Sequence, residues 1–384
     1  MASILIDAGA QHWLALGRVE GLGTRSAQRL VEHFGSPEAV YGATLTALEG
    51  CGLTAPVAQR LHNGAGLAEA EREMAAAEKL GCRLLTSASP DYPPLLKQIS
   101  DPPLVLYVRG DAGLLARHSV AVVGTRRPTA YGSSVAHRLA ADLARRQIVI
   151  VSGLARGIDS ASHRGALEAQ GKTVAVLGCG ADVIYPRENK RLTEQILETG
   201  ALISEFPLGT SPQPENFPIR NRIISGLALG VVVVEAAEYS GSLITARLAS
   251  EQDREVYAVP GNITSAQSFG PNLLIKQGAK LVDNWMDVVE EFPAAIRAEL
   301  MPSREGTDKG ESAAPALFEL GPAPGLTEDQ RAVYDALRAD QALFIDSIFG
   351  QVPLPPPRIL LALLELEMNG LVRQLPGKNF IRKL

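Results

Sequence analysis

The chain has 384 residues, of which 46% are apolar and only 5% aromatic, so we expect two or three domains whose cores are mainly aliphatic. Its three cysteines are isolated in the sequence, which argues against a zinc site or a disulfide framework and fits a reducing, cytoplasmic environment. Residues 1–7 lack the basic region of a signal peptide, and no stretch reaches the roughly 18 apolar residues of a membrane helix, so neither secretion nor a membrane partner is expected.

The formal net charge of −5 would by itself argue against a nucleic-acid partner, but the charges are unevenly distributed. Residues 117–191 contain 12 Lys/Arg and 5 Asp/Glu, a balance of +7, whereas the rest of the chain contains 25 basic and 37 acidic residues. Such asymmetry concentrates positive potential on one part of a protein and favours an anionic partner. Arginines scattered over the surface would give the same count, so charge alone leaves both interpretations open.

Residues 1–85 are predicted to form a small helical domain. Two similar units, at 16–23 and 48–54, each combine the end of a helix with a glycine-containing hairpin and the start of another helix. They resemble tandem helix-hairpin-helix units or a sterile-alpha-motif-like (SAM-like) bundle, and the Ala/Glu-rich residues 67–80 predict one further helix. Helix-hairpin-helix units can hold a DNA phosphate, but the second hairpin carries little positive charge, so a packing or interaction domain is the alternative.

Residues 86–293 are predicted to form an α/β domain with an extended Rossmann-like, doubly wound, mostly parallel sheet. Short Val/Ile-rich runs alternate with amphipathic helices such as 133–146 and 160–169, and continuous apolar runs are typical of parallel strands buried on both faces. This alternation indicates βαβ units with right-handed crossovers. The expected strands are 104–108, 120–123, 148–151, 174–177, 202–205, 231–234, 256–259 and 280–282.

Residues 294–325 lose this periodicity and are predicted to be a flexible linker, followed by a winged-helix-like domain at 326–384. The third helix of that domain is apolar and acidic, unlike a helix that reads a DNA groove. We therefore expect at most a weak DNA contact through the wing, with protein contact as the alternative. The expected elements are a helix capped by Thr327 and ending near Leu337, helices at 346–352 and 358–368, and a hairpin at 371–381.

Glycine, serine and arginine follow several predicted strands, at the sheet edge where open α/β folds bind their ligands. Small residues let backbone amides approach an anion, and arginine can hold a phosphate with two hydrogen bonds. These loops predict a phosphate-binding rim with Arg126 and Arg187 at its centre, and Phe217 either stacks on a base or belongs to the core. The candidate DNA-binding residues are Gly124, Thr125, Arg126, Arg127, Ser152, Gly153, Arg156, Arg187, Lys190, Phe217, Arg220, Asn221, Arg222, Ser240, Gly241, Ser242 and Thr245.

No catalytic, cofactor or metal set can be recognised in the sequence. A dinucleotide-binding GxGxxG motif begins at Gly178 but has Val183 at its last glycine position, and a GxxxxGK[ST] phosphate loop is absent. The six histidines form no HxH or HExxH spacing, and no Ser/His/Asp set is evident. We therefore expect a protein that is not an enzyme and needs neither cofactor nor metal.

The chain resembles the DNA processing protein A family, also called DprA or Smf, in seven short runs between residues 110 and 285. The resemblance implies a recombination mediator that binds single-stranded DNA, protects incoming strands in natural transformation and loads RecA recombinase onto them. It also implies a homodimer through the Rossmann-like domain, and it assigns Arg126, Arg187, Phe217, Arg220 and the loop 240–245 to the DNA pocket. The runs are VGTR at 123–126, SGLARGID at 152–159, YP at 185–186, FPIRNRII at 217–224, SGSLITA at 240–246, VPGN at 259–262 and LLIKQGA at 273–279.

An enzyme of the nucleotide phosphoribohydrolase, or lysine-decarboxylase-like, kind is the alternative, because that group has a related Rossmann-like core. Its members carry a Pro-Gly-Gly-x-Gly-Thr-x-x-Glu loop, which supplies both the phosphate site and the catalytic acid. The corresponding residues 240–245 read SGSLIT, without the glycine cluster or the glutamate. The sequence therefore favours the DNA-binding mediator.

Overall fold

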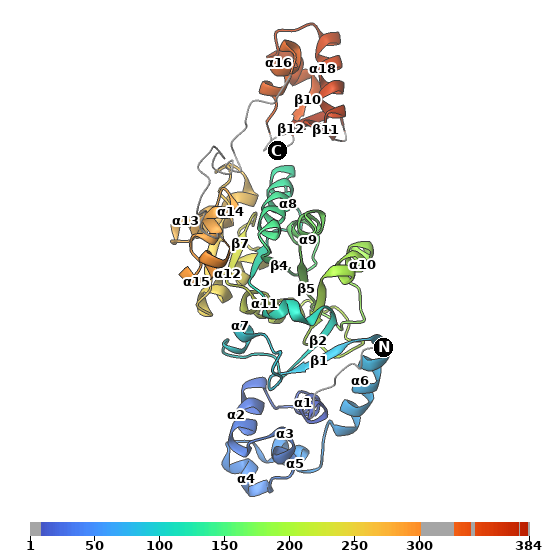
Figure 1. The fold of residues 1–384 in the computed structure, drawn as a ribbon, viewed down its shortest axis with the longest axis vertical. Helices are drawn as coiled ribbons and strands as arrows, with labels where there is room; N and C mark the ends of the chain where they lie inside the picture. The colour runs from blue at the N-terminus through green and yellow to red at the C-terminus, as the bar shows by residue number, and fades with distance from the viewer. Residues whose placement is uncertain (1–8, 301–325, 339–341, 376, 383–384) are drawn as a thin grey trace.

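A nine-stranded sheet lies at the centre of the chain (Figure 1), and its strand order is β1-β2-β6-β5-β4-β3-β7-β8-β9. The computed structural model describes residues 9–300, 326–338, 342–375 and 377–382. The seven strands from β6 to β9 in this order are parallel, and β2 and β1 continue the sheet in antiparallel pairings. The strands are β1 Arg83–Thr86, β2 Val105–Gly110, β3 Ser119–Val123, β4 Val149–Ser152, β5 Thr173–Val176, β6 Ala201–Ser204, β7 Gly230–Val233, β8 Glu255–Ala258 and β9 Lys280–Leu281.

The predicted doubly wound, mostly parallel sheet is confirmed, and each of the eight expected strands is present within a residue or two of its expected bounds. Strand β1 was not expected. It pairs with β2 through residues 83–86, so the expected domain boundary at residue 85 falls inside a strand of the sheet.

Helices cover both faces of the sheet, because alternate residues of each strand point to opposite sides. In β3, Val120 and Val122 pack on one face while Ala121 and Val123 pack on the other. The first face is covered by α8 Ala130–Arg145, α9 Ile158–Glu168 and α14 Trp285–Val289, and the second by α7 Pro94–Lys97, α11 Asn216–Leu227 and α12 Gly241–Glu251. The remaining elements of this part are α10 Lys190–Thr199, α13 Phe269–Lys276, α15 Ala294–Leu300 and the short 3₁₀ helices η1 Ala112–Ala116, η2 Arg187–Asn189 and η3 Ala266–Ser268.

The direction of winding reverses between β3 and β7, which are neighbours in the sheet. From β3 the chain adds β4, β5 and β6 on one side, and it then returns through α11 to add β7, β8 and β9 on the other. Loops that leave neighbouring strands in opposite directions open a crevice at the carboxyl ends of the strands. The topology alone therefore places a ligand site beside the loops that follow β3 and β7.

A bundle of six helices precedes the sheet and shares a hydrophobic core with β1 and β2, in which Trp13 and Leu14 pack with Val105 and Tyr107. A partly buried polar contact adds to this junction. Glu73 pairs with Arg18 at 2.6 Å and accepts a hydrogen bond of 2.6 Å from the backbone N–H of Leu208, in the loop after β6. The helices are α1 Ala10–Leu16, α2 Thr24–Phe34, α3 Pro37–Tyr41, α4 Leu45–Gly50, α5 Ala55–His62 and α6 Leu67–Leu80.

The C-terminal residues form three helices and a three-stranded sheet of order β10-β12-β11, which is a winged-helix arrangement as predicted. Thr327 caps the first helix through a reciprocal capping box with Gln330. The expected linker is corrected at its start, because 294–300 are helical, and residues 301–325 lie outside the described residues. The elements are α16 Glu328–Ala336, β10 Leu343–Phe344, α17 Ile345–Gln351, α18 Pro356–Met368, β11 Val372–Leu375 and β12 Asn379–Arg382.

In the part of the chain that the structure describes, no helix has both the length and the apolar character to cross a membrane.

Candidate nucleic-acid interface

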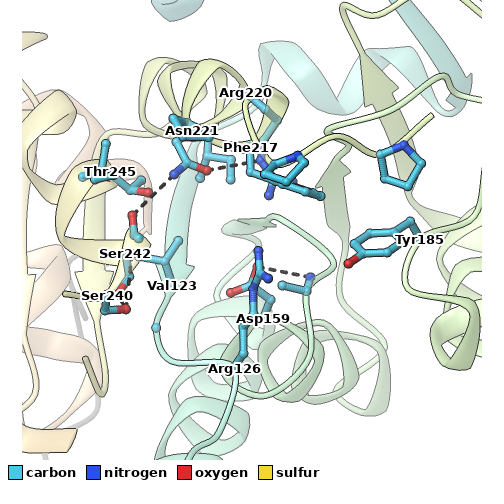
Figure 2. A pocket seen from close by; sticks show the side chains of 18 residues that line it. Val123, Arg126, Asp159, Tyr185, Phe217, Arg220, Asn221, Ser240, Ser242 and Thr245 are labelled. Carbon is cyan, nitrogen blue, oxygen red and sulfur yellow. Dashed lines mark hydrogen bonds between the residues drawn. The ribbon is translucent and has the colours of Figure 1, made fainter. Parts of the chain in front are cut away.

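A cavity of about 480 Å³ lies at the carboxyl ends of the central strands, where the topology places a ligand site. Its walls come from the loops that follow β3, β4, β5, β6 and β7, so segments far apart in the sequence meet there. Figure 2 shows Arg126 and Asp159 on one side of the cavity, with Phe217 and Arg220 across from them. A second cavity of about 340 Å³ adjoins the first, since the two share Arg126, Ala155, Tyr185 and Phe217.

Arg126 is the most available cation at the junction of the two cavities. It is exposed in the loop after β3, and its guanidinium lies 5.3 Å from the centre of the Phe217 ring. Among the described residues no carboxylate forms an ion pair with it. An arginine without a protein counter-ion can give both of its parallel N–H groups to a phosphate, so this side chain is suited to hold one at the mouth of the site.

Phe217 and Tyr185 form an aromatic platform beside Arg126 (Figure 2). Their ring centroids are 5.6 Å apart and the ring planes are tilted by 37°. Gly178 lies directly under Phe217, where a side chain would place its Cβ 2.8 Å from the ring. Tyr185 was not among the predicted site residues, although it belongs to the family-like Tyr-Pro pair, because a tyrosine next to proline is as easily a turn residue as a stacking residue.

Arg220 lies beneath this platform and holds the base of the site in place through hydrogen bonds. Its buried guanidinium donates hydrogen bonds to the carbonyls of Gly153, at 2.8 Å, and Val176. Burial lowers the pKa of Arg220 to about 10, with Asp159 opposing this effect, so the group stays charged at neutral pH. Arg220 therefore shapes the loop after β4 and supplies a fixed positive charge.

Asp159 lies at the start of α9 and holds the loop after β4 in place. Its carboxylate accepts hydrogen bonds from the backbone N–H groups of Gly153 and Ala155, at 3.1 and 3.3 Å. Burial raises the pKa of Asp159, while the positive charge of Arg220 opposes the rise. This side chain was not predicted as part of the site, and its backbone contacts indicate that it holds the loop in place.

Small polar side chains form the opposite wall, at the first turn of α12. Ser240 caps this helix and its hydroxyl lies 2.8 Å from that of Ser242. The side-chain amide of Asn221 donates to the carbonyl of Gly241 at 3.4 Å and accepts from Nε of Arg220 at 3.3 Å. Backbone amides at a helix start together with hydroxyl groups are suited to bind an anion.

The two cavities bring together twelve of the seventeen predicted site residues. Of these, Arg156 is already paired with Glu188 at 2.5 Å. The loop of Thr125 is fixed by a hydrogen bond of 2.7 Å to the carbonyl of Glu235, and Thr125 lines neither cavity. Arg187 was predicted at the centre of the rim, but it lines neither cavity, because it lies in η2, which Asn189 anchors to the carbonyl of Leu154 at 2.8 Å. Arg187 and Lys190 are both exposed outside the cavities. The twelve are Gly124, Arg126, Arg127, Gly153, Arg156, Phe217, Arg220, Asn221, Ser240, Gly241, Ser242 and Thr245.

Two predicted DNA contacts, Ser152 and Arg222, are corrected by the structure. Ser152 is fully buried at the end of β4, and its hydroxyl donates to the carbonyl of Val122 at 2.7 Å. Arg222 lies in an internal ion-pair network with Glu205, at 2.6 Å, and Asp101, at 3.0 Å. Both side chains have their hydrogen-bonding groups committed to the protein, so they support the fold instead of facing a ligand.

The part of the chain that forms this site is matched by a known family. The family model described as DNA recombination-mediator protein A matches residues 83–293, more than half of the chain. The chain belongs to this family. A second family model, the DprA winged helix domain, matches residues 319–378.

Relatives from several bacteria extend this assignment along the chain. The chain is 48% identical over 223 residues to the DNA processing protein DprA of Bacillus subtilis, which covers 58% of this chain and 75% of the relative. It is 41% identical over 298 residues to the protein Smf of Escherichia coli, covering 77% and 76% of the two chains. The X-ray structure of DprA from Streptococcus pneumoniae superposes with a TM-score of 0.66 at 34% identity, over 75% of this chain and 99% of the other. Membership of the family makes the chain a DNA recombination mediator.

Replacing Arg126 with alanine should weaken binding of a poly-dT oligonucleotide by about 1–3 kcal/mol, as expected when a charge-assisted hydrogen bond is lost. The salt dependence should also flatten, by about 0.7 in the slope of log K against log salt for one phosphate. A salt titration by fluorescence anisotropy measures both quantities. Arg164→Ala is the control, because Arg164 is exposed on α9 outside both cavities. Equal slopes and affinities for the Arg126→Ala and Arg164→Ala proteins would contradict the assignment of Arg126.

Replacing Phe217 with alanine should reduce the preference for single-stranded over duplex DNA. Stacking of a base on an aromatic ring contributes about 1–3 kcal/mol, and only an unpaired base can reach the ring. Competition between matched single-stranded and duplex oligonucleotides measures the preference. Phe217→Tyr, which keeps the ring, should retain it, and an equal loss in the two variants would show that stacking is not the cause.

Proposed function

We propose that the two adjoining cavities bind single-stranded DNA, with a phosphate held at Arg126 and a base stacked at Phe217. This proposal rests on the guanidinium of Arg126, which has no ion-pair partner among the described residues and lies 5.3 Å from the centre of the Phe217 ring. The two side chains meet at the point where the winding of the sheet reverses. The other ten predicted contacts that line the cavities support it as a group. They surround the same hollow and offer arginine, serine and backbone amide donors, which are the groups that bind phosphate oxygens.

Single strands fit this site better than a duplex because the aromatic ring lies inside a hollow. Phe217 is half-buried and lies between Tyr185, Arg126 and Arg220. A base that is stacked and paired within a duplex cannot reach such a ring without being extruded, which costs a few kcal/mol. A flexible single strand can turn one base inward while its phosphates lie along the positive rim. The site is therefore selective for strands that are already unpaired.

The mediator role of the family suggests how the bound strand is used. We propose that the chain protects incoming single strands in natural transformation and loads RecA recombinase onto them, in the cytoplasm. A strand held mainly by one or two phosphates and a stacked base leaves most of its length accessible to a recombinase. The described cysteines are free, which fits that compartment.

We also propose that the chain has no enzymatic activity of its own. The alternative, a nucleotide phosphoribohydrolase, requires a carboxylate that can reach the substrate from the loop after β7. In this chain the residues after β7 that line the cavity include Ser240, Ser242 and Thr245 but no carboxylate. Two glutamates do follow β7, but Glu235 is buried and accepts hydrogen bonds from Thr129, and Glu238 does not line the cavity. The carboxylate of Asp159 lines the cavity from the other side, but it is buried and accepts two backbone hydrogen bonds.

A homodimer through the Rossmann-like domain is part of the proposal, and an exposed apolar patch supports it. Phe269 and Leu273 lie one turn apart on α13, and Ile263 and Tyr239 are more than 90% exposed in adjacent loops. Hydrogen bonds from Ala236 to Gln267 and from Gly270 to Ala236 tie these loops together. An apolar patch of this kind on a water-exposed domain is typical of a protein interface, and a two-fold axis through it would bury the same residues of both copies.

Purified full-length protein should bind poly-dT in filter-binding or anisotropy titrations, should speed RecA assembly on that strand, and should not hydrolyse AMP, ATP or DNA. Nucleotide hydrolysis that persists through repurification and disappears in an Asp159→Asn variant would favour the enzyme instead. The double-stranded form of the same sequence is the control for strand selectivity. Affinities for the two forms within twofold of each other would contradict the proposed selectivity.

Replacing Leu273 with glutamate should weaken dimerisation through the α13 patch, because burying a charge without a partner in an apolar interface is strongly unfavourable. Sedimentation velocity over a range of concentrations measures the change. Ala298→Glu adds the same charge on the exposed helix α15, outside the patch, and should leave association unchanged. A Leu273→Glu protein that associates like the Ala298→Glu protein would place the interface elsewhere.

A further inference from the structure

Helix α18 of the winged-helix domain carries an uncovered apolar stripe. Leu361, Leu364 and Met368 are 56, 55 and 80% exposed, and Leu360 at the margin is 47% exposed. The opposite side of the helix is buried in the domain through Ile359, Ala362, Leu363 and Leu366. A helix that is apolar on both sides normally lies inside a protein, so this one lacks a covering element in the described part of the chain.

The stripe is poorly suited to DNA. In a winged helix this is the helix that enters a groove, and its exposed side chains would have to meet base edges or phosphates. Here they are leucine and methionine, while the arginine at the start of the helix, Arg358, lies at the margin of the stripe beside Asp329, with which it forms a two-point ion pair with both distances at 2.5 Å. The chemistry of the exposed face therefore fits an apolar protein surface.

The spacing along the stripe is symmetric. Exposed Pro357 extends the stripe by one turn toward the start of the helix. Pro357, Leu361, Leu364 and Met368 are separated by four, three and four residues, so the pattern is the same when the helix is reversed. We propose that α18 pairs with α18 of a second copy of the chain in an antiparallel arrangement. A two-fold axis midway between Leu361 and Leu364 places each of these residues opposite the other in the second copy, and Pro357 opposite the second copy's Met368.

The charges at the margin of the stripe select this antiparallel direction. Arg358 and Glu365 are seven residues apart and therefore lie on the same side of the helix, within about 20°. In the antiparallel pair, Arg358 comes within two residues of the second copy's Glu365, about 3 Å along the axis. In a parallel pair this margin would instead face the opposite margin of the second helix, which carries Leu360 and Glu367, and Arg358 would lie beside Leu360. Arg358 keeps 59% of its side-chain surface exposed beside Asp329, and Glu365 accepts a hydrogen bond from Gln330 at 2.7 Å.

A second copy is a better occupant than an unrelated protein because nothing on the stripe selects a different sequence. Its centre has no charged or hydrogen-bonding side chain. The stripe of a second copy, running in the opposite direction, presents the same spacing of apolar residues. This contact involves neither the proposed DNA cavities nor the patch at α13, so it is tested separately from the proposed function.

Disulfide trapping in the full-length chain tests the register. The background carries Cys51→Ser, which removes the exposed cysteine, while Cys82 and Cys179 are buried. A mixture of Met368→Cys and Pro357→Cys proteins should form a cross-linked dimer under mild oxidation, and a mixture of Leu361→Cys and Leu364→Cys proteins should do the same. Met368→Cys alone should not, because its two cysteines would be about 16 Å apart along the axis, beyond the reach of a disulfide. Failure of both mixtures, or equal cross-linking of Met368→Cys alone, would overturn the antiparallel pairing.

A charge in the stripe tests the contact without any cross-link. In the Leu273→Glu background, which excludes a contribution from the α13 patch, Leu364→Glu should weaken self-association by about tenfold or more. Phe344→Glu is the matched control, because Phe344 is 44% exposed on β10, outside the stripe. Circular dichroism and thermal melting confirm that both variants are folded. Sedimentation equilibrium that gives the same dissociation constant for the two variants would overturn the proposal.

Discussion

The buried guanidinium of Arg220 joins three parts of the molecule at one point. It extends from α11, the helix that carries the chain back across the sheet, and donates to the carbonyls of Gly153 and Val176 at the ends of β4 and β5. A buried arginine is tolerable only where its donors are satisfied and a counter-charge is near, and here Asp159 supplies that charge. The position of Phe217, one turn earlier on α11, is a consequence of this anchor.

The arginines around the two cavities therefore differ in how available they are to bind a phosphate. Arg220 is buried and fully engaged, Arg156 is exposed but paired with Glu188, and Arg126 has no ion pair among the described residues. An incoming phosphate would have to displace Glu188 to reach Arg156, whereas it meets Arg126 directly. Because the charge of Arg220 is balanced by Asp159, the attraction at the mouth of the site depends mainly on the exposed loop after β3.

The sequence was sufficient for the central sheet because parallel strands buried on both faces are continuous Val/Ile runs that few other structures produce. It was not sufficient for β1, a short antiparallel strand, Arg83–Thr86, that directly follows helix α6. The sequence also predicted that most of the candidate residues lie around one hollow, since the loops after parallel strands must share one edge. The sequence could not show which side chains of one motif face the cavity and which support the fold. Arg220 and Arg222 are two residues apart on α11, so they point to opposite sides of the helix, one into the cavity and one toward Glu205. The prediction for Ser152 failed for a similar reason. Successive residues of a strand point to opposite faces, and the motif does not reveal which of these faces is open to a ligand.

The contact between Glu73 and the backbone of Leu208 gives the N-terminal helices a mechanical connection to the site. Leu208 belongs to the same short segment after β6 that supplies Pro212 and Pro214 to the cavity wall. Helix α6, which carries Glu73, is thus joined to that wall by this hydrogen bond and by the core that Trp13 and Tyr107 share. Because only a short stretch of backbone separates Leu208 from Pro212, the placement of the N-terminal helices constrains the shape of the cavity.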